Sequence, residues 1–234
     1  MNTPEAQIYN DYSRTKKWEL RIKGLLEKSW ESIIKLKRWV AILIFLNISF
    51  FLLGYGMVEF GYSYALKFRE RQLNEIPNLS YLQPLLGALS PYLSLKILYT
   101  FLFNLVAGAF VSTTLTGIAL FLPFIITMYR AWFVGVVFHG FLSSPLFTIV
   151  FVGTFILEFG AYVLSASVGI RVGCALIFPE RCYSLKRKEA FLASLKDGFW
   201  VYLMVMILLF LGAIWEITWL HNMNSLTIGR LGSE

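Results

Sequence analysis

The sequence predicts an all-α, multi-pass membrane protein with about five transmembrane helices preceded by an amphipathic N-terminal helix. Of its 234 residues, 57% are hydrophobic and only 15% are charged, and the mean hydropathy is +0.64. Soluble domains carry about 25% charged residues. Several stretches here reach the roughly 20 apolar residues that a helix needs to cross a bilayer. We therefore expect a membrane domain over residues 39–220, preceded by a cytoplasmic segment over 1–38 and followed by a polar tail over 221–234.

Residues 1–38 contain nine Lys or Arg and five Asp or Glu. Their apolar positions follow the spacing of one helix face and include Trp18, Ile22, Leu25, Leu26 and Ile33. A basic amphipathic helix of this kind can lie on the anionic headgroups of a leaflet. It can also pack against loops of the same protein, and both interpretations stay open at this point.

Five spans account for the apolar stretches, and we expect them at residues 39–58, 97–116, 118–139, 146–175 and 198–220. Residues 59–96 mix charged side chains with prolines, so this connection is expected outside the hydrocarbon core. Pro123 lies near the start of the third span. It leaves open a break there, with a longer span followed by a re-entrant half-helix.

The distribution of cationic residues predicts the orientation of the chain. Nine Lys or Arg precede the first span, and five more lie in the loop over residues 179–197. Five spans place both groups on the same side, which the positive-inside rule assigns to the cytoplasm. We expect a cell-membrane protein with a cytoplasmic N-terminus and a C-terminus outside.

Glu158 and Arg130 are the strongest candidates for a functional site. Each lies near the middle of an expected span, where charged side chains are costly and either pair or mark a transport pathway. Because their spans are consecutive and antiparallel, we expect the two side chains to meet inside the bundle. The pair would then fix helix registration or serve transport, and a catalytic role is a third interpretation. Asn104 is expected to form an interhelical hydrogen bond or to contact a substrate.

Two rows of small or polar residues predict close helix packing, because small side chains let two backbones approach. The rows are Asn104, Gly108, Ser112 and Thr116 in one span, and Ala161, Ser165, Gly169 and Gly173 in another. We expect the rows to pack on each other or to form a subunit interface in a homo-oligomer.

The sequence favours no catalytic or metal site. Both histidines, His139 and His221, lie near the ends of expected spans, and Cys174 and Cys182 do not form a CxxC motif. The chain contains no P-loop and no Gly-rich dinucleotide motif. We therefore expect no enzyme activity, no cofactor, no metal and no nucleic-acid partner.

Several of these residues also occur in a characteristic order between positions 97 and 179. They are Asn104, Gly108, Gly117, Pro123 and Gly135, followed by Glu158, Ala161, Ser165, Gly169 and Gly173. This order resembles the stage II sporulation protein M family. The family motif has His and Gly where Thr154 and Phe155 stand here, which puts in doubt any activity that depends on a His–Glu couple. The resemblance implies an integral membrane protein with five spans, and in endospore formers a membrane partner of cell-wall hydrolases.

We therefore interpret the chain as a non-enzymatic membrane scaffold that acts through protein partners, as a homo-oligomer, with anionic lipid headgroups bound by its basic helix. The alternative is a small-solute or ion transporter or channel that uses Glu158 near the midplane, together with Arg130.

Overall fold

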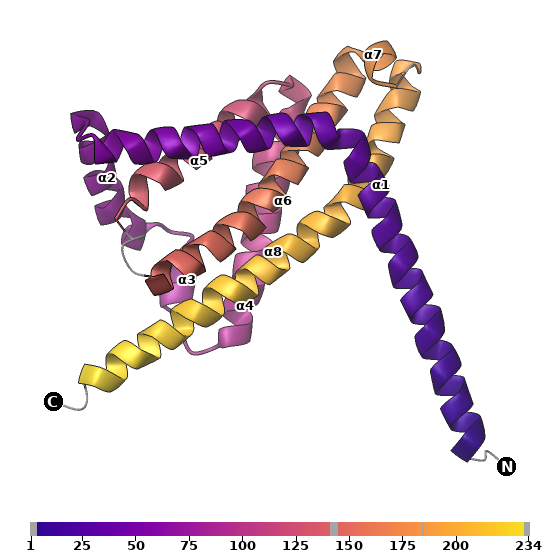
Figure 1. Ribbon diagram of the computed structural model, residues 1–234, viewed down its shortest axis with the longest axis horizontal. Coiled ribbons are helices and arrows are strands. Elements are labelled where there is room, and N and C mark those ends of the chain that lie inside the picture. The colour runs from indigo at the N-terminus through magenta and orange to yellow at the C-terminus, as the bar shows by residue number, and fades with distance from the viewer. Residues whose placement is uncertain (1–3, 141–144, 184, 232–234) are drawn as a thin grey trace.

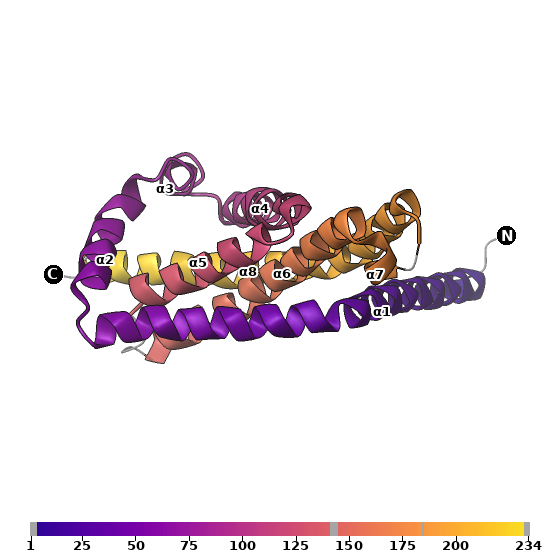
Figure 2. The same ribbon diagram turned by 90° about the horizontal axis from the view of Figure 1, so that it is seen from above.

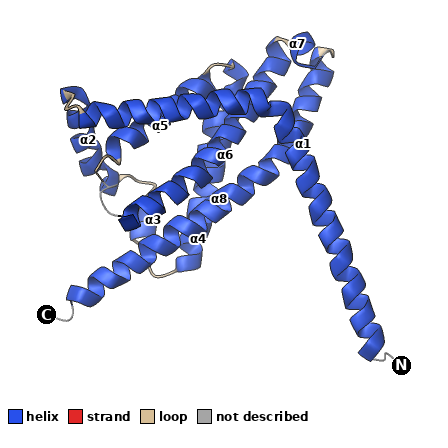
Figure 3. Cartoon of the chain, viewed as in Figure 1, coloured by secondary structure: helices blue, strands red, loops and turns tan. Residues whose placement is uncertain are grey.

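The computed structural model describes residues 4–140, 145–183 and 185–231, and every regular element within these ranges is a helix (Figure 3). The long helices α6 (Pro145–Ile177) and α8 (Arg187–Leu231) lie side by side, connected at one end through the short α7 (Pro179–Tyr183), and α1 (Pro4–Glu59) crosses them (Figure 1). The other elements are α2 (Ser63–Glu75), the 3₁₀ turn η1 (Ile76–Asn78), α3 (Gln83–Leu86), α4 (Leu93–Phe103), the π-helix η2 (Asn104–Thr114), the 3₁₀ helix η3 (Leu115–Ala119) and α5 (Leu122–Val137).

The described helices have the length and composition of a membrane protein. Four of them are long and apolar enough to cross a bilayer, over residues 16–59, 93–119, 147–177 and 187–221. The shorter apolar helix α5 has 16 residues. The prediction of an all-α, multi-pass membrane protein is therefore confirmed.

The expected amphipathic helix and the first span form one continuous helix, α1, of 56 residues. The residues between Ile34 and Trp39 include no Gly and no Pro, so nothing in this stretch ends a helix. α1 bends where it meets the bundle, and its N-terminal part projects away from the body (Figures 1 and 2). We call residues 16–28 of this part the arm.

α8 begins well before the expected span at 198 and continues through most of the segment expected as a polar tail. Ala190, Ser194 and Asp197 lie on one face at helical spacing and are all buried, which explains the early start. Lys35 Nζ donates to Asp197 Oδ1 at 2.7 Å, so the first turns of α8 are tied to α1.

The second expected span changes its winding twice along its length. α4 passes into the π-helix η2, with i→i+5 hydrogen bonds, and then into the 3₁₀ helix η3. The break near Pro123 is centred on Leu120, whose φ of +52° is a strained value for a leucine. Pro123 lies in the first turn of α5, where the missing N–H costs no hydrogen bond.

The second predicted row faces the segment that carries the first row, and there backbone touches backbone within one chain. A Cβ added at Gly117 would overlap the backbone of Gly169, and one added at Gly173 would overlap the Gly117 carbonyl group. A Cβ at Gly169 would lie 2.5 Å from the Thr113 carbonyl oxygen. The hydroxyl groups of Thr113 and Ser165 are 2.7 Å apart across the same contact. We call these five residues the glycine seam.

The register of the first row differs from the prediction. The side of the segment that contacts α6 carries Asn104, Gly108, Thr113 and Gly117. Ser112 faces α5 instead, and the Thr116 hydroxyl bonds back to the Ser112 carbonyl oxygen. The physical reason is the π winding, because a turn of a π-helix contains more residues than the 3.6 assumed in the prediction.

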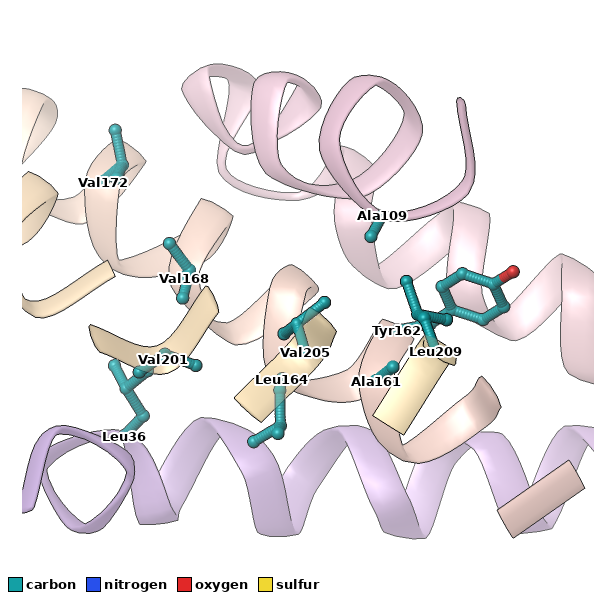
Figure 4. Packing of buried hydrophobic residues seen from close by; sticks show 10 residues of the cluster. All are labelled: Leu36, Ala109, Ala161, Tyr162, Leu164, Val168, Val172, Val201, Val205 and Leu209. Atoms are coloured by element: carbon teal, nitrogen blue, oxygen red, sulfur yellow. The ribbon is translucent and has the colours of Figure 1, made fainter. Parts of the chain in front are cut away.

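The apolar core lies between α6 and α8, with α1 packed across them (Figure 4). Val201, Val205 and Leu209 recur every fourth residue on α8 and are fully buried. α5 packs along α1 through a second close approach, where Gly135 lies against the Phe51 carbonyl group. Arg69 Nη2 donates to the His139 carbonyl oxygen at 2.8 Å, joining α2 to the end of α5.

We predict that the glycine seam tolerates no added side chain. Gly173→Ala should lower the free energy of unfolding by about 1–3 kcal/mol, because the new methyl group overlaps a backbone carbonyl that cannot move alone. The matched control is Gly160→Ala on the same helix, where the added Cβ lies 3.8 Å from a Leu208 methyl group. Thermal unfolding in detergent measures both variants, and equal melting temperatures would contradict the seam.

Candidate functional site

A cavity of about 740 Å³ is lined by residues of α4, α5, α6 and α8. This volume is typical of small-molecule sites. Most of its lining consists of Leu, Ile, Val and Phe side chains. Its charged and amide side chains are Lys96, Asn104, Arg130, Glu158 and Glu216. Its α6 residues Glu158 and Tyr162 precede the glycine seam in the helix, whereas α7 follows the seam.

The segment between α2 and α4 forms one wall of the cavity. Tyr99 donates its hydroxyl proton to the Tyr81 carbonyl oxygen at 2.8 Å, and the rings of Tyr81 and Phe103 stack at 4.9 Å. These contacts hold the segment against α4. Burial raises the pKa of the Tyr81 hydroxyl, so this phenol stays neutral at physiological pH. Leu86 in the same wall is 64% exposed, so the wall reaches the molecular surface.

Glu158 is held between η2 and α8. Asn104 Nδ2 donates to Glu158 Oε1 at 2.7 Å, so the predicted interhelical hydrogen bond of Asn104 is formed to this carboxylate. On the other side, a Cβ at Gly212 would lie 3.3 Å from Glu158 Cγ, so α8 passes close to the acid. The carboxylate is partly exposed because it faces the cavity.

Arg130 is anchored to neutral groups of η2 and α6. Its Nη1 donates to the Gly108 carbonyl oxygen at 3.1 Å, and its Nη2 donates to Ser112 Oγ at 2.9 Å. The guanidinium carbon lies 4.7 Å from the centre of the Tyr162 ring, a cation–π contact. Gly108 makes this arrangement possible, because a Cβ there would lie 2.8 Å from the Tyr162 ring.

The expected ion pair between Arg130 and Glu158 is not formed. The ion pairs within the described ranges are Lys35–Asp197 and Arg71–Glu75, and His139 Nε2 lies 2.7 Å from Glu59 Oε2. Both side chains line the same cavity, but each has a nearer neutral partner, which removes the need for a direct contact.

Two charged groups of the cavity, Lys96 and Glu216, are not among the predicted site residues. Lys96 falls at the end of the expected connection over residues 59–96, and Glu216 lies near the end of the expected span over residues 198–220. Lys96, Thr100 and Asn104 follow helical spacing and all line the cavity, so a polar face was visible in the sequence. Glu216 likewise follows Gly212 by one turn on α8, on the side that contacts Glu158.

On the α7 side of the cavity the helices are joined by hydroxyl contacts. Thr114 donates to the Ser165 carbonyl oxygen at 2.9 Å, and its hydroxyl lies 2.6 Å from that of Tyr202 on α8. Ala161 is fully buried in the core. Together with the glycine seam, these contacts close the bundle at one end of the cavity.

A family model described as Stage II sporulation protein M matches residues 40–219, a range that includes every cavity side chain named above. No curated protein and no solved structure matches the chain significantly.

We predict that Asn104 and Glu158 are energetically coupled. In a double-mutant cycle of Asn104→Ala and Glu158→Ala, the coupling energy should be about 1–3 kcal/mol. Either single substitution already removes the hydrogen bond to the carboxylate, so the double variant loses no second bond. Reversible unfolding in detergent measures the cycle. Asn104→Ala combined with Arg71→Ala on the exposed face of α2 is the control, and it should be additive within about 0.5 kcal/mol. Additivity in both cycles would contradict the contact.

Proposed function

We propose that this chain, which belongs to the Stage II sporulation protein M family, is a non-enzymatic membrane transporter that takes a small charged solute into its cavity. The observation that carries this proposal is the group of charged side chains inside a membrane bundle. Charged residues at this depth are rare and costly, and they are characteristic of substrate and ion pathways.

The shape of the bundle around the cavity supports transport over a purely structural role. One wall of the cavity is a connecting segment that reaches the surface, and the opposite end is closed by the glycine seam. A cavity that holds charged side chains and is closed at one end by tightly packed helices is the arrangement expected of a carrier open to one side. A structural ion pair would need no cavity, and Arg130 and Glu158 do not form one.

Irregular winding next to the site is a second supporting feature. Transporters place their binding sites where helices are interrupted, since the altered backbone can reach the solute and can act as a hinge. Here the segment from Asn104 to Ala119 is wound as π and 3₁₀ helix, and it ends at the strained Leu120. Strain of this kind persists only where the surrounding structure enforces it, and it often marks a moving part.

We predict solute flux that depends on the cavity carboxylates. Purified protein in proteoliposomes should move one member of a panel of protons, sodium, potassium, chloride, phosphate and amino acids. For a cation or an amino acid, Glu216→Gln should reduce that flux at least about tenfold, because the contact of the carboxylate with the positive charge of the solute is lost. Glu189→Gln, at an exposed position in the first turn of the same helix, should keep the wild-type rate. No flux for any member of the panel would overturn the proposal.

A second candidate function, a membrane scaffold, is favoured by the arm. The helix face that carries Ser29, Ser32 and Leu36 is buried against the body, and the same face continues into the arm as Trp18 and Ile22. These two side chains are 61% and 54% exposed. The apolar stripe therefore continues past the edge of the bundle, with nothing from the described chain beneath it.

We propose that an anionic leaflet covers this stripe. The arm is continuous with a helix that crosses the bundle, so it lies at the membrane surface, and it carries Lys16, Lys17, Arg21, Lys23 and Lys28. Basic side chains above an apolar stripe match a surface of anionic headgroups over acyl chains. A helix held flat on the leaflet would fix the orientation of partner proteins.

The arm proposal predicts a one-sided lipid contact. Benzoylphenylalanine introduced at Ile22 of the full chain should cross-link to lipid in phosphatidylglycerol proteoliposomes, with a lower yield in phosphatidylcholine. The same probe at Glu31, on the opposite face, should give no lipid adduct. Mass spectrometry identifies the adducts. Equal yields at both positions, or adducts to protein at Ile22, would contradict the proposal.

A further inference from the structure

Two oppositely charged side chains of the cavity take part in none of the ion pairs of the described ranges. Lys96 on α4 is only 9% exposed, yet it forms no ion pair with any described residue. Glu216 on α8 lines the same cavity and is also absent from the ion pairs of the described ranges. The hydroxyl group of Thr100, one turn after Lys96, is buried without a hydrogen-bond partner within the described structure. Buried charges are normally paired, so this arrangement is incomplete without a ligand.

The other polar groups of the cavity are already engaged. Arg130 is bound to Gly108 and Ser112, and Asn104 is bound to Glu158. The groups left to recognise a ligand are therefore the Lys96 ammonium with the neighbouring Thr100 hydroxyl on α4, and the Glu216 carboxylate on α8, which interacts electrostatically with the Glu158 carboxylate. Lys96 and Glu216 line the same cavity and form no ion pair with each other, so one ligand can contact both.

We propose that the cavity binds a zwitterion with an apolar body, an inference that rests on the proposed transport function. The ligand's carboxylate contacts Lys96 and Thr100, and its ammonium group contacts Glu216. A lone cation would satisfy Glu216 but leave Lys96 unpaired, and a lone anion would do the reverse. A zwitterion satisfies both and adds no net charge to a low-dielectric site, so its burial costs least.

The uncharged side chains that line the cavity indicate the chemical character of the rest of the ligand. Leu79, Leu82, Phe133 and Phe159 line the cavity beside the charged groups. These side chains favour a ligand with an apolar body, because its apolar surface is removed from water when it packs against them. Amino acids with a large apolar side chain fit this description. The zwitterionic headgroup of phosphatidylethanolamine shares the charge pattern, so the experiment must separate the two sources.

The test is binding of matched ligands to the full chain in nanodiscs of phosphatidylglycerol, which carry no zwitterionic lipid. Phenylalanine should bind at least about tenfold more tightly than phenylalaninamide, which lacks the anionic group, or N-acetylphenylalanine, which lacks the cationic group. Lys96→Gln should abolish the preference over phenylalaninamide, and Glu216→Gln the preference over N-acetylphenylalanine. The exposed controls Lys186→Gln and Glu189→Gln should keep both preferences. Calorimetric titration measures the affinities.

The outcomes separate this inference from the proposed function. If phenylalanine binds no better than its two analogues while another solute shows cavity-dependent flux, the zwitterion is wrong and transport stands. If there is neither binding nor flux, both proposals fail. Loss of phenylalanine binding on replacing phosphatidylglycerol with phosphatidylethanolamine would support the zwitterion site and identify a lipid headgroup as its occupant.

Discussion

The contact between α6 and the segment from α4 to η3 is the constraint on which the rest of the structure depends. At the glycine seam, Gly117 and Gly173 bring two backbones together with no space for a methyl group. This contact fixes both the depth and the rotation of the irregular segment relative to α6. Asn104 consequently reaches Glu158, and Gly108 and Ser112 present their oxygen atoms to Arg130. The register between this segment and α6 therefore brings together most of the polar side chains of the cavity.

The same segment also explains how a bilayer protein accommodates Arg130. A guanidinium group has five hydrogen-bond donors and no acceptor, and the hydrocarbon core of a bilayer contains no acceptors for them. In this fold a backbone carbonyl, a serine hydroxyl and the face of Tyr162 surround it. Because this cradle is made of neutral groups, Arg130 forms no ion pair with Glu158. The acid shares the cavity with Arg130, Glu216 and Lys96.

Sequence reasoning correctly identified the protein class, the family and the polar centre of the bundle. Glu158, Arg130 and Asn104 do line one cavity, and the second small row does pack against the segment that carries the first. The direct ion pair was wrong because neutral groups lie nearer to each charge. The prediction of which residues of the first row face α6 was wrong after Gly108. The π winding of η2 turns Thr113 and Gly117 toward α6 in place of Ser112 and Thr116.

The sequence by itself determined whether each helix lies in lipid, in water or against another helix. Apolar length, charge distribution and small-residue spacing are local properties, and they report whether a segment meets lipid, water or another helix. The tertiary structure alone decided which helices meet and at what depth. Lys96 and Glu216 are separated by 120 positions in the chain, so no local pattern records that they share a cavity. Their meeting follows from the packing of α4 and α8, which depends on the relative depth and rotation of helices distant in sequence.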